Sequence, residues 1–210
     1  HRDRERRRLR LDEPDPVAPR RVELASPRVQ QPSWTRYYLA PSYNRGATEH
    51  AYALEVLAEI IGSGSTSRLY RRLAVEQGLA AGTGAWYDPD AVDLATFAIS
   101  ASPRPGVSVE DLQAAIEAEI AKLLADGVTE EELASAKTLL RAGAVKARDS
   151  LSGPARALGA ALATGSTIDD VESWPDRIGA VTVEQVNAAA RAVLVPEASV
   201  TSVLLPKETS

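Results

Sequence analysis

The 210-residue chain is long enough for one well-buried core, and two small domains are possible but not required. It contains no cysteine and only two histidines, His1 and His50, which excludes disulfides, thiolate metal sites and a multi-histidine zinc site. Residues 1–21 carry eight arginines against five acidic residues, so the remaining chain has a net charge of −8. The acidic body argues against a nucleic-acid partner. The apolar runs fall far short of the ~20 residues that cross a bilayer, so no membrane partner is expected either.

Residues 1–20 are expected to form a linker or arm ahead of a single α+β domain over residues 21–210. The segment contains Arg6, Arg7 and Arg8 followed by several prolines, which provide charge and stiffness without an apolar face. Two interpretations stay open for this segment. It could be a basic docking arm, or it could be a solvated connector between two domains.

The first part of the domain predicts two strands and a helix. Strands are expected at 22–24 and at 34–39, where aromatic and β-favouring residue types gather. A helix over 48–61 follows, because apolar residues recur on one face with helical spacing. Thr48 is the expected cap of this helix and Gly62 its expected stop.

The middle of the chain predicts a second, shorter helix and a pair of strands. The helix is expected over about 66–76, and the strands near 80–87 and 94–101. The segment 88–90, Asp-Pro-Asp, has the composition of a turn and therefore favours an antiparallel pair.

The second half predicts several helices, each marked by a capping signal at its start, and a closing strand over 199–205. The signals are a Ser or Thr three residues before an acidic or amide side chain, at Ser108, Thr129, Thr167 and Thr182, and a Gly-Pro pair after Ser152. Hairpins together with grouped helices favour an α+β fold, a mostly antiparallel sheet with helices packed on one face.

No segment of the sequence predicts a catalytic or metal site. The pair Glu49-His50 suggests half of a zinc motif, but the position one helical turn before His50 is Gly46, so the first ligand is missing. The glycine- and serine-rich segment 62–67 could cradle an anion, yet it lacks the lysine of a nucleotide loop and is better explained as a turn between helices. No hydrolase-type nucleophile elbow is present.

Several short patterns occur in a specific order. They are Gln30 to Trp34, Ala40 to Tyr43, Ser67-Arg68-Leu69, Glu76, Gly78-Leu79-Ala80, and Phe97 to Pro105 followed by a helix at Ser108. Over residues 20–205 this order resembles the C-terminal homology domain of pitrilysin/insulinase-type zinc metallopeptidases and of their mitochondrial processing relatives. The residues of the family turn, given a structural role, are Gly62, Gly64, Ser67, Arg68 and Gly78.

The resemblance implies that zinc and the general-base glutamate lie in a preceding N-terminal domain, so no cofactor is expected in this chain. Implied partners are that zinc-binding domain, a homologous partner subunit and a peptide substrate enclosed in a chamber. A related domain of the family contributes an arginine and a tyrosine that contact substrate. The matching positions here are Ala74 and Ala81, so no substrate-binding residue carries over. This pattern fits the zinc-bearing subunit better than its partner, although an inactive paralogue would look the same.

Two functions from different classes follow. The first is the non-catalytic C-terminal domain of a bacterial zinc-dependent endopeptidase, which supports the zinc domain and forms part of the peptide-enclosing chamber. The alternative is an inactive paralogue that acts as a scaffold or binds peptides by strand addition. An unrelated α+β domain is a third option. Frequent alanine and arginine with little lysine indicate a bacterium with GC-rich codons, and periplasm and cytoplasm both stay open.

Overall fold

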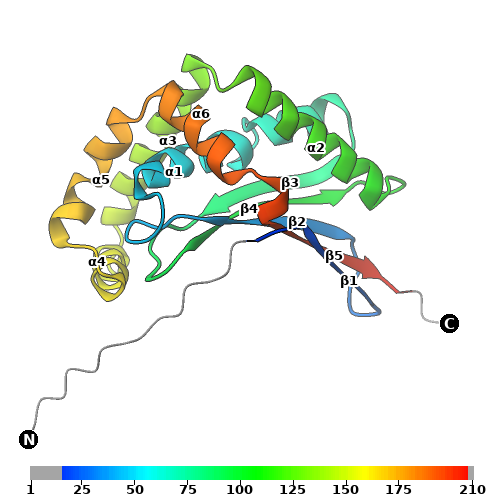
Figure 1. The fold of residues 1–210 in the computed structure, drawn as a ribbon, viewed down its shortest axis with the longest axis horizontal. Coiled ribbons are helices and arrows are strands. Elements are labelled where there is room, and N and C mark those ends of the chain that lie inside the picture. The colour runs from blue at the N-terminus through cyan, green and yellow to red at the C-terminus, as the bar shows by residue number, and fades with distance from the viewer. Residues whose placement is uncertain (1–15, 208–210) are drawn as a thin grey trace, which may run out of the picture.

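The computed structural model describes residues 16–207, in which one five-stranded sheet carries a layer of helices on one face (Figure 1). The strand order is β1-β5-β2-β4-β3, and every neighbouring pair is antiparallel except the parallel pair of β1 and β5. The expected α+β class with a mostly antiparallel sheet is therefore confirmed. The strands are β1 (Arg20–Ser26), β2 (Ser33–Ala40), β3 (Ala80–Tyr87), β4 (Ala95–Pro103) and β5 (Ser199–Pro206).

The helical layer consists of α1 (Ala51–Gly62), α2 (Val109–Asp126), α3 (Glu130–Arg148), α4 (Gly153–Thr164), α5 (Ile168–Ala180) and α6 (Val183–Val193). Short helical turns lie at η1 (Thr48–His50), η2 (Tyr70–Glu76) and η3 (Pro196–Ala198). The capping signals of α2, α3, α5 and α6 work as expected, because in each helix the Ser or Thr side chain accepts from the backbone amide three residues on.

Alternation along the strands divides the sheet into a buried and an uncovered face. The helices completely bury Phe97 and Ile99 of β4, which agrees with the alternation predicted for this strand. They also completely bury Trp34 of β2 and Val203 of β5. No described helix covers the opposite face (Figure 1). We call this the open face, and its exposed large side chains are Val22, Leu24, Tyr37, Trp86 and Leu204.

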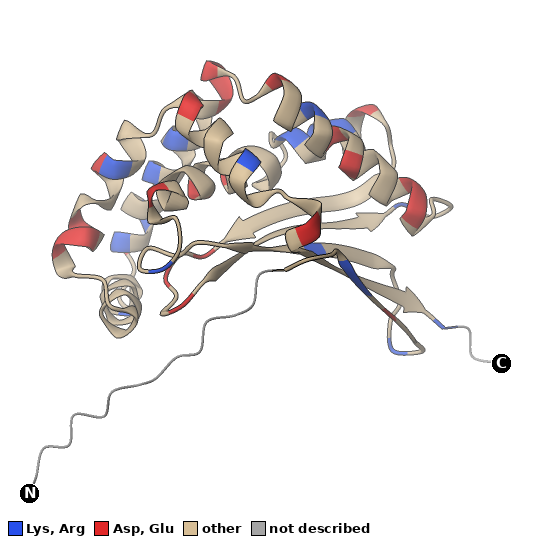
Figure 2. Cartoon of the chain, in the orientation of Figure 1, with Lys and Arg blue, Asp and Glu red and all other residues tan. Residues whose placement is uncertain are grey.

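Charge follows the same division. Figure 2 shows the acidic and basic residues gathered mainly over the helical layer, while most of the sheet carries none. Strands β3, β4 and β5 contain no charged residue, and β2 contains only Arg36, which points toward the helices and donates to Glu117 at 2.7 Å. In β1, Arg21 donates to Gln113 of α2 at 2.7 Å and Glu23 alternates to the same face, while Arg20 shares the face of Val22 and Leu24. The open face thus carries little charge.

Three local expectations need correction. Thr48 makes no capping hydrogen bond, since it belongs to the tight turn η1 and α1 begins only at Ala51. The expected helix over 66–76 widens into a π-helix at η2, where the amide of Gln77 donates to the carbonyl of Arg72, five residues back, at 3.0 Å. Most of the expected arm, residues 1–15, lies outside the described residues, and β1 already begins at its last position, Arg20.

Candidate functional site

The glycines and serine of the family turn close the end of α1 tightly. Gly62 is the last residue of α1 and faces the backbone of β3 so closely that a Cβ there would lie 1.9 Å from the amide nitrogen of Ala85. Gly64 adopts a φ of +74°, a left-handed conformation that glycine accepts without strain. The Ser67 hydroxyl is buried and donates to the Gly64 carbonyl at 2.9 Å. The Ser67–Gly64 hydrogen bond lies within the turn, and Gly62 packs against β3.

Arg68 joins this turn to the start of α3. Its guanidinium donates to both carboxylate oxygens of Glu132, at 2.9 and 2.6 Å, and to the carbonyl of Gly127 at 3.0 Å. Glu132 also accepts from the amide of Thr129 and completes the capping box of α3. Partial burial alone would raise the pKa of the Glu132 carboxyl, but the hydrogen bonds from Arg68 and Thr129 lower it below its usual value. Arg68 is therefore fully engaged in holding two elements together.

The two positions that correspond to the family's arginine and tyrosine lie in different environments. Ala74 is buried at η2, and its carbonyl accepts from Arg104 Nη2 at 2.8 Å. Ala81 is exposed in β3, at the irregularity where the register shifts between Ala80 and Gly82. An arginine at position 74 would require the core around η2 to rearrange.

The structure also locates the metal and loop candidates. Glu49 and His50 lie in η1, directly ahead of α1. Within residues 16–207, no group of three or more His, Cys, Asp or Glu side chains is arranged to hold a metal ion. Gly78 precedes β3 with a φ of +67°, so it serves the turn out of η2. None of the described helices is both long and apolar enough to span a bilayer.

A cavity of about 790 Å³ lies beside the first half of α1, which contributes Tyr52 and Glu55 to its lining. Its walls come from α1, α3, α4 and α5, and from the loop that connects β3 to β4. Most of the lining is apolar, and the polar lining groups are mainly carboxylates and tyrosines. Its aromatic and acidic lining residues include Tyr43, Tyr52, Glu55, Asp88, Asp90 and Trp174. This cavity is the candidate functional site.

Glu55 of α1 is the central polar group of the cavity wall. The hydroxyl of Tyr43 donates to it at 2.5 Å, and the indole Nε1 of Trp174 donates at 3.0 Å. Burial raises the pKa of Glu55 to about 7, against the lowering effect of these two hydrogen bonds, and the negative charges of Asp90 and Asp88 raise it further. A carboxyl group with this pKa changes charge near neutral pH.

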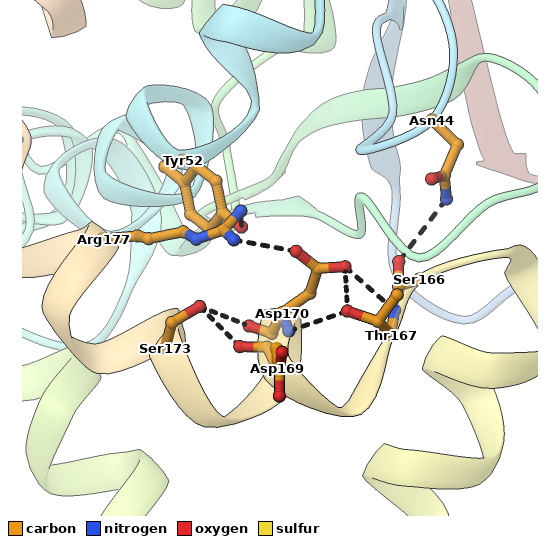
Figure 3. Close-up of polar contacts among 8 residues, drawn as sticks. All are labelled: Asn44, Tyr52, Ser166, Thr167, Asp169, Asp170, Ser173 and Arg177. Carbon is orange, nitrogen blue, oxygen red and sulfur yellow. Dashed lines mark hydrogen bonds and ion pairs between the residues drawn. The ribbon is translucent and has the colours of Figure 1, made fainter.

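The start of α5 forms the edge of the cavity and is held by a dense set of polar contacts (Figure 3). Asp170 caps α5 through Thr167 and accepts from Arg177 at 2.8 Å. The hydrogen bonds from Thr167 are the main reason that the pKa of Asp170 lies below its usual value. Arg177 also donates to the hydroxyl of Tyr52 at 2.8 Å and lies 5.4 Å from the centre of that ring. The contacts between Arg177 and Tyr52 connect α5 to α1.

The loop before α1 joins the same edge of the cavity. Asn44 donates to Ser166 at 3.5 Å (Figure 3). It also donates to the carbonyl of Thr164 at 3.2 Å. Sequence reasoning missed this cavity. One signal was available, since Glu55 is a charged residue at the border of the apolar stripe expected for the first helix, where it adjoins Leu54 and Ala58.

The fold itself defines the class of protein: an α+β domain like those of solved peptidase M16 proteins. A protease from Helicobacter pylori is similar with a TM-score of 0.85 and 21% identity, over 94% of this chain and 46% of that one. A peptidase M16 inactive domain from Pseudomonas fluorescens gives a TM-score of 0.76 and 23% identity, over 96% of this chain and 47% of that one. An inactive peptidase domain from Bordetella parapertussis gives 0.76 and 21%, over 90% and 96% of the two chains.

The family model described as the peptidase M16 inactive domain matches residues 4–140, and the chain belongs to this family. An uncharacterized zinc protease of Mycobacterium leprae is 32% identical over 146 residues, which are 70% of this chain and 32% of that protein. A counterpart in Mycobacterium tuberculosis H37Rv is 32% identical over 148 residues, or 70% and 33%. The chain thus spans about a third of the length of these curated relatives. The expected non-catalytic domain of a zinc-protease-type protein is confirmed.

Proposed function

We propose that this domain supports a zinc-binding N-terminal domain of the same polypeptide and that its open face forms part of the wall of a peptide-enclosing chamber. The zinc and the general base would belong to that other domain, and a homologous partner subunit would close the chamber. The names of the mycobacterial relatives support a proteolytic parent protein.

The open face is the observation that carries this proposal. Tyr37 is 38% exposed and Trp86 is 45% exposed, and their rings pack edge to face at 6.2 Å between centres. Val22 and Leu24 extend the apolar surface across β1, with exposed fractions of 59% and 57%. A broad, nearly uncharged surface of this kind suits contact with unfolded peptide of varied sequence or with another domain.

We further propose that residues 21–210 form one folding unit and that residues 1–20 connect it to the preceding domain. The completeness of the described core supports this division, because one continuous cluster runs from Trp34 in β2 to Val203 in β5. Because Ala74 and Ala81 provide no arginine or tyrosine, we assign the parent protein to the zinc-bearing type of subunit.

The test is reconstitution. The 210-residue chain would be mixed with its upstream half and with the homologous partner subunit, and peptide cleavage would be measured with and without a chelator. We expect chelator-sensitive cleavage only in the full mixture. Cleavage of peptide by this chain alone, inhibited by chelator, would contradict the proposal.

The scaffold alternative is supported by the edges of the sheet. Within the described part of the chain, strand β1 pairs only with β5 and is exposed along its length, so its other edge could accept an added peptide strand. The sequence encoded upstream in the gene would distinguish the two proposed functions. A paired-histidine motif there supports the endopeptidase, and its absence supports the scaffold.

A further inference from the structure

The cavity beside Glu55 carries an excess of negative charge. Asp88 and Asp90 lie in the β3–β4 loop, Glu172 lies on α5, and Arg148 at the end of α3 is the one basic side chain among the described lining residues. Asp170 also lines the cavity but is already paired with Arg177. Burial, and then the neighbouring charge of Asp88, raises the pKa of Asp90. Among the described residues, no ion pair to Asp88 or Asp90 is formed.

The cavity walls offer aromatic rings whose polar atoms are already used. The Tyr43 hydroxyl donates to Glu55, and the Tyr87 hydroxyl donates to the carbonyl of Pro41 at 2.6 Å. The indole nitrogen of Trp174 also donates to Glu55. What remains for a ligand is therefore the apolar surface of the rings together with the neighbouring Ala157 and Leu158 of α4.

The protein already holds one guanidinium at the edge of this cavity. Arg177 lies over the ring of Tyr52 and pairs with the carboxylate of Asp170, so an aromatic surface and an acid together bind a cation there (Figure 3). At the β3–β4 loop the same two kinds of group occur together, since the exposed Asp88 and the half-buried Asp90 flank Pro89, whose carbonyl accepts from the backbone amide of Tyr43 at 3.2 Å. Arg148 is the one cation among the described lining residues.

We propose that this cavity is a binding site for the guanidinium or ammonium group of a basic peptide side chain. The charged group lies near Asp88 and Asp90, and the aliphatic part of the side chain packs against the aromatic and alanine-rich walls. An anionic ligand would be repelled by the carboxylates, and a neutral apolar ligand would bury them without a positive partner. The proposal concerns this domain by itself and does not depend on the chamber function.

The first experiment uses the unmodified 210-residue protein and two acetylated, amidated tripeptides, Ala-Arg-Ala and Ala-citrulline-Ala. Citrulline has nearly the shape of arginine but no charge. Titrations followed by calorimetry and by backbone amide shifts should show the arginine peptide binding ~10-fold more tightly, with shifts around Asp88 and Trp174. Equal affinity for the two peptides, shifts confined to other surfaces, or no binding of the arginine peptide at millimolar concentration would each overturn the proposal.

A double variant and a control variant test whether Asp88 and Asp90 bind the positively charged group of the peptide. Asp88→Asn with Asp90→Asn keeps the shape of the loop, because the new amide side chain at position 88 retains an oxygen that can accept from the backbone amide of residue 90, as Asp88 does at 3.1 Å. This double variant should bind the arginine peptide ~5- to 10-fold more weakly and the citrulline peptide unchanged. Asp93→Asn, in the same loop but outside the cavity lining, is the matched control and should bind as the unmodified protein does. Unchanged affinity in the double variant would also overturn the proposal.

Discussion

The two ends of helix α1 serve opposite purposes. At its C-terminal end Gly62 packs directly against β3, and Arg68 and Glu132 neutralise each other between the turn and α3. Near its start, Glu55 borders an open cavity together with Asp88 and Asp90, which form no ion pair with any of the described residues. The closed end is arranged for stability, whereas the open end retains charge and volume that cost stability, which is typical of a binding surface.

The largest effect should come from Gly62→Ala. A Cβ at this position would overlap the backbone at Ala85, so α1 and β3 would have to move apart, at a cost of about 3 kcal/mol or more. The free energy of unfolding in urea measures this loss. Gly64→Ala is the control, because the space around Gly64 is open and only its left-handed backbone is strained, for about 1 kcal/mol. Equal losses in the two variants would show that the tight contact at Gly62 is unimportant.

A smaller loss is expected for Arg68→Met, which leaves Glu132 without its guanidinium partner. We expect the free energy of unfolding at pH 7 to fall by about 2 kcal/mol. Because the folded-state pKa of Glu132 is lowered, its contribution is present above the unfolded pKa and disappears as the pH falls through the folded pKa. The difference between variant and unmodified protein should therefore shrink in acid.

Urea unfolding at several pH values checks the Arg68 prediction. Arg71→Met is the matched control, since Arg71 lies on the same turn but is exposed. It should change stability by less than about 0.5 kcal/mol. A loss with Arg71→Met as large as that with Arg68→Met, or a loss with Arg68→Met that does not depend on pH, would contradict the role given to the Arg68–Glu132 pair.

At the start of α1, removal of a charge should raise the free energy of unfolding instead of lowering it. Glu55→Gln removes a charge but keeps an oxygen that can accept from both Tyr43 and Trp174, as Glu55 Oε1 does. Since burial raises the folded-state pKa of Glu55 to about 7, its protonated form stabilises the fold below the unfolded pKa, and this stability is lost as the pH rises toward 7. The variant should therefore be more stable than the unmodified protein at pH 8, by about 1 to 2 kcal/mol.

Thermal unfolding between pH 4 and 8 tests the Glu55 prediction. The advantage of Glu55→Gln should become small near pH 4, where the carboxyl of the unmodified protein is mostly protonated in both the folded and the unfolded state. Glu59→Gln, one turn further along α1 and outside this cavity, should show no such dependence. A Glu55→Gln protein that is less stable at pH 8 would indicate that the carboxylate itself stabilises the fold.

Local features of this fold could be predicted from the sequence. The capping boxes at Thr129, Thr167 and Thr182 depend on residues three positions apart, and the alternation in β4 depends on neighbours two positions apart. Thr48 misled the prediction because a tight turn, and not α1, begins there. Nothing in the local pattern marks the hydrogen bonds between residues five positions apart at η2, an element that packs against β3.

The cavity could not be predicted in the same way. Tyr43, Glu55 and Trp174 come from a loop and two helices, and the tryptophan lies 119 positions from the glutamate in sequence. Only the tertiary fold brings these groups together. A charged residue beside an apolar stripe indicates that some partner is needed, but it does not identify which residues supply it.

The parallel pairing of β1 with β5 has a consequence for synthesis of the protein. Strand β5 lies between β1 and β2, yet it is the last strand of the described chain to leave the ribosome. Until it emerges, β1 has no neighbour in the sheet and the edge of β2 stays unpaired. Until β5 is made, the edges of β1 and β2 that it will occupy are therefore open to pairing with other strands.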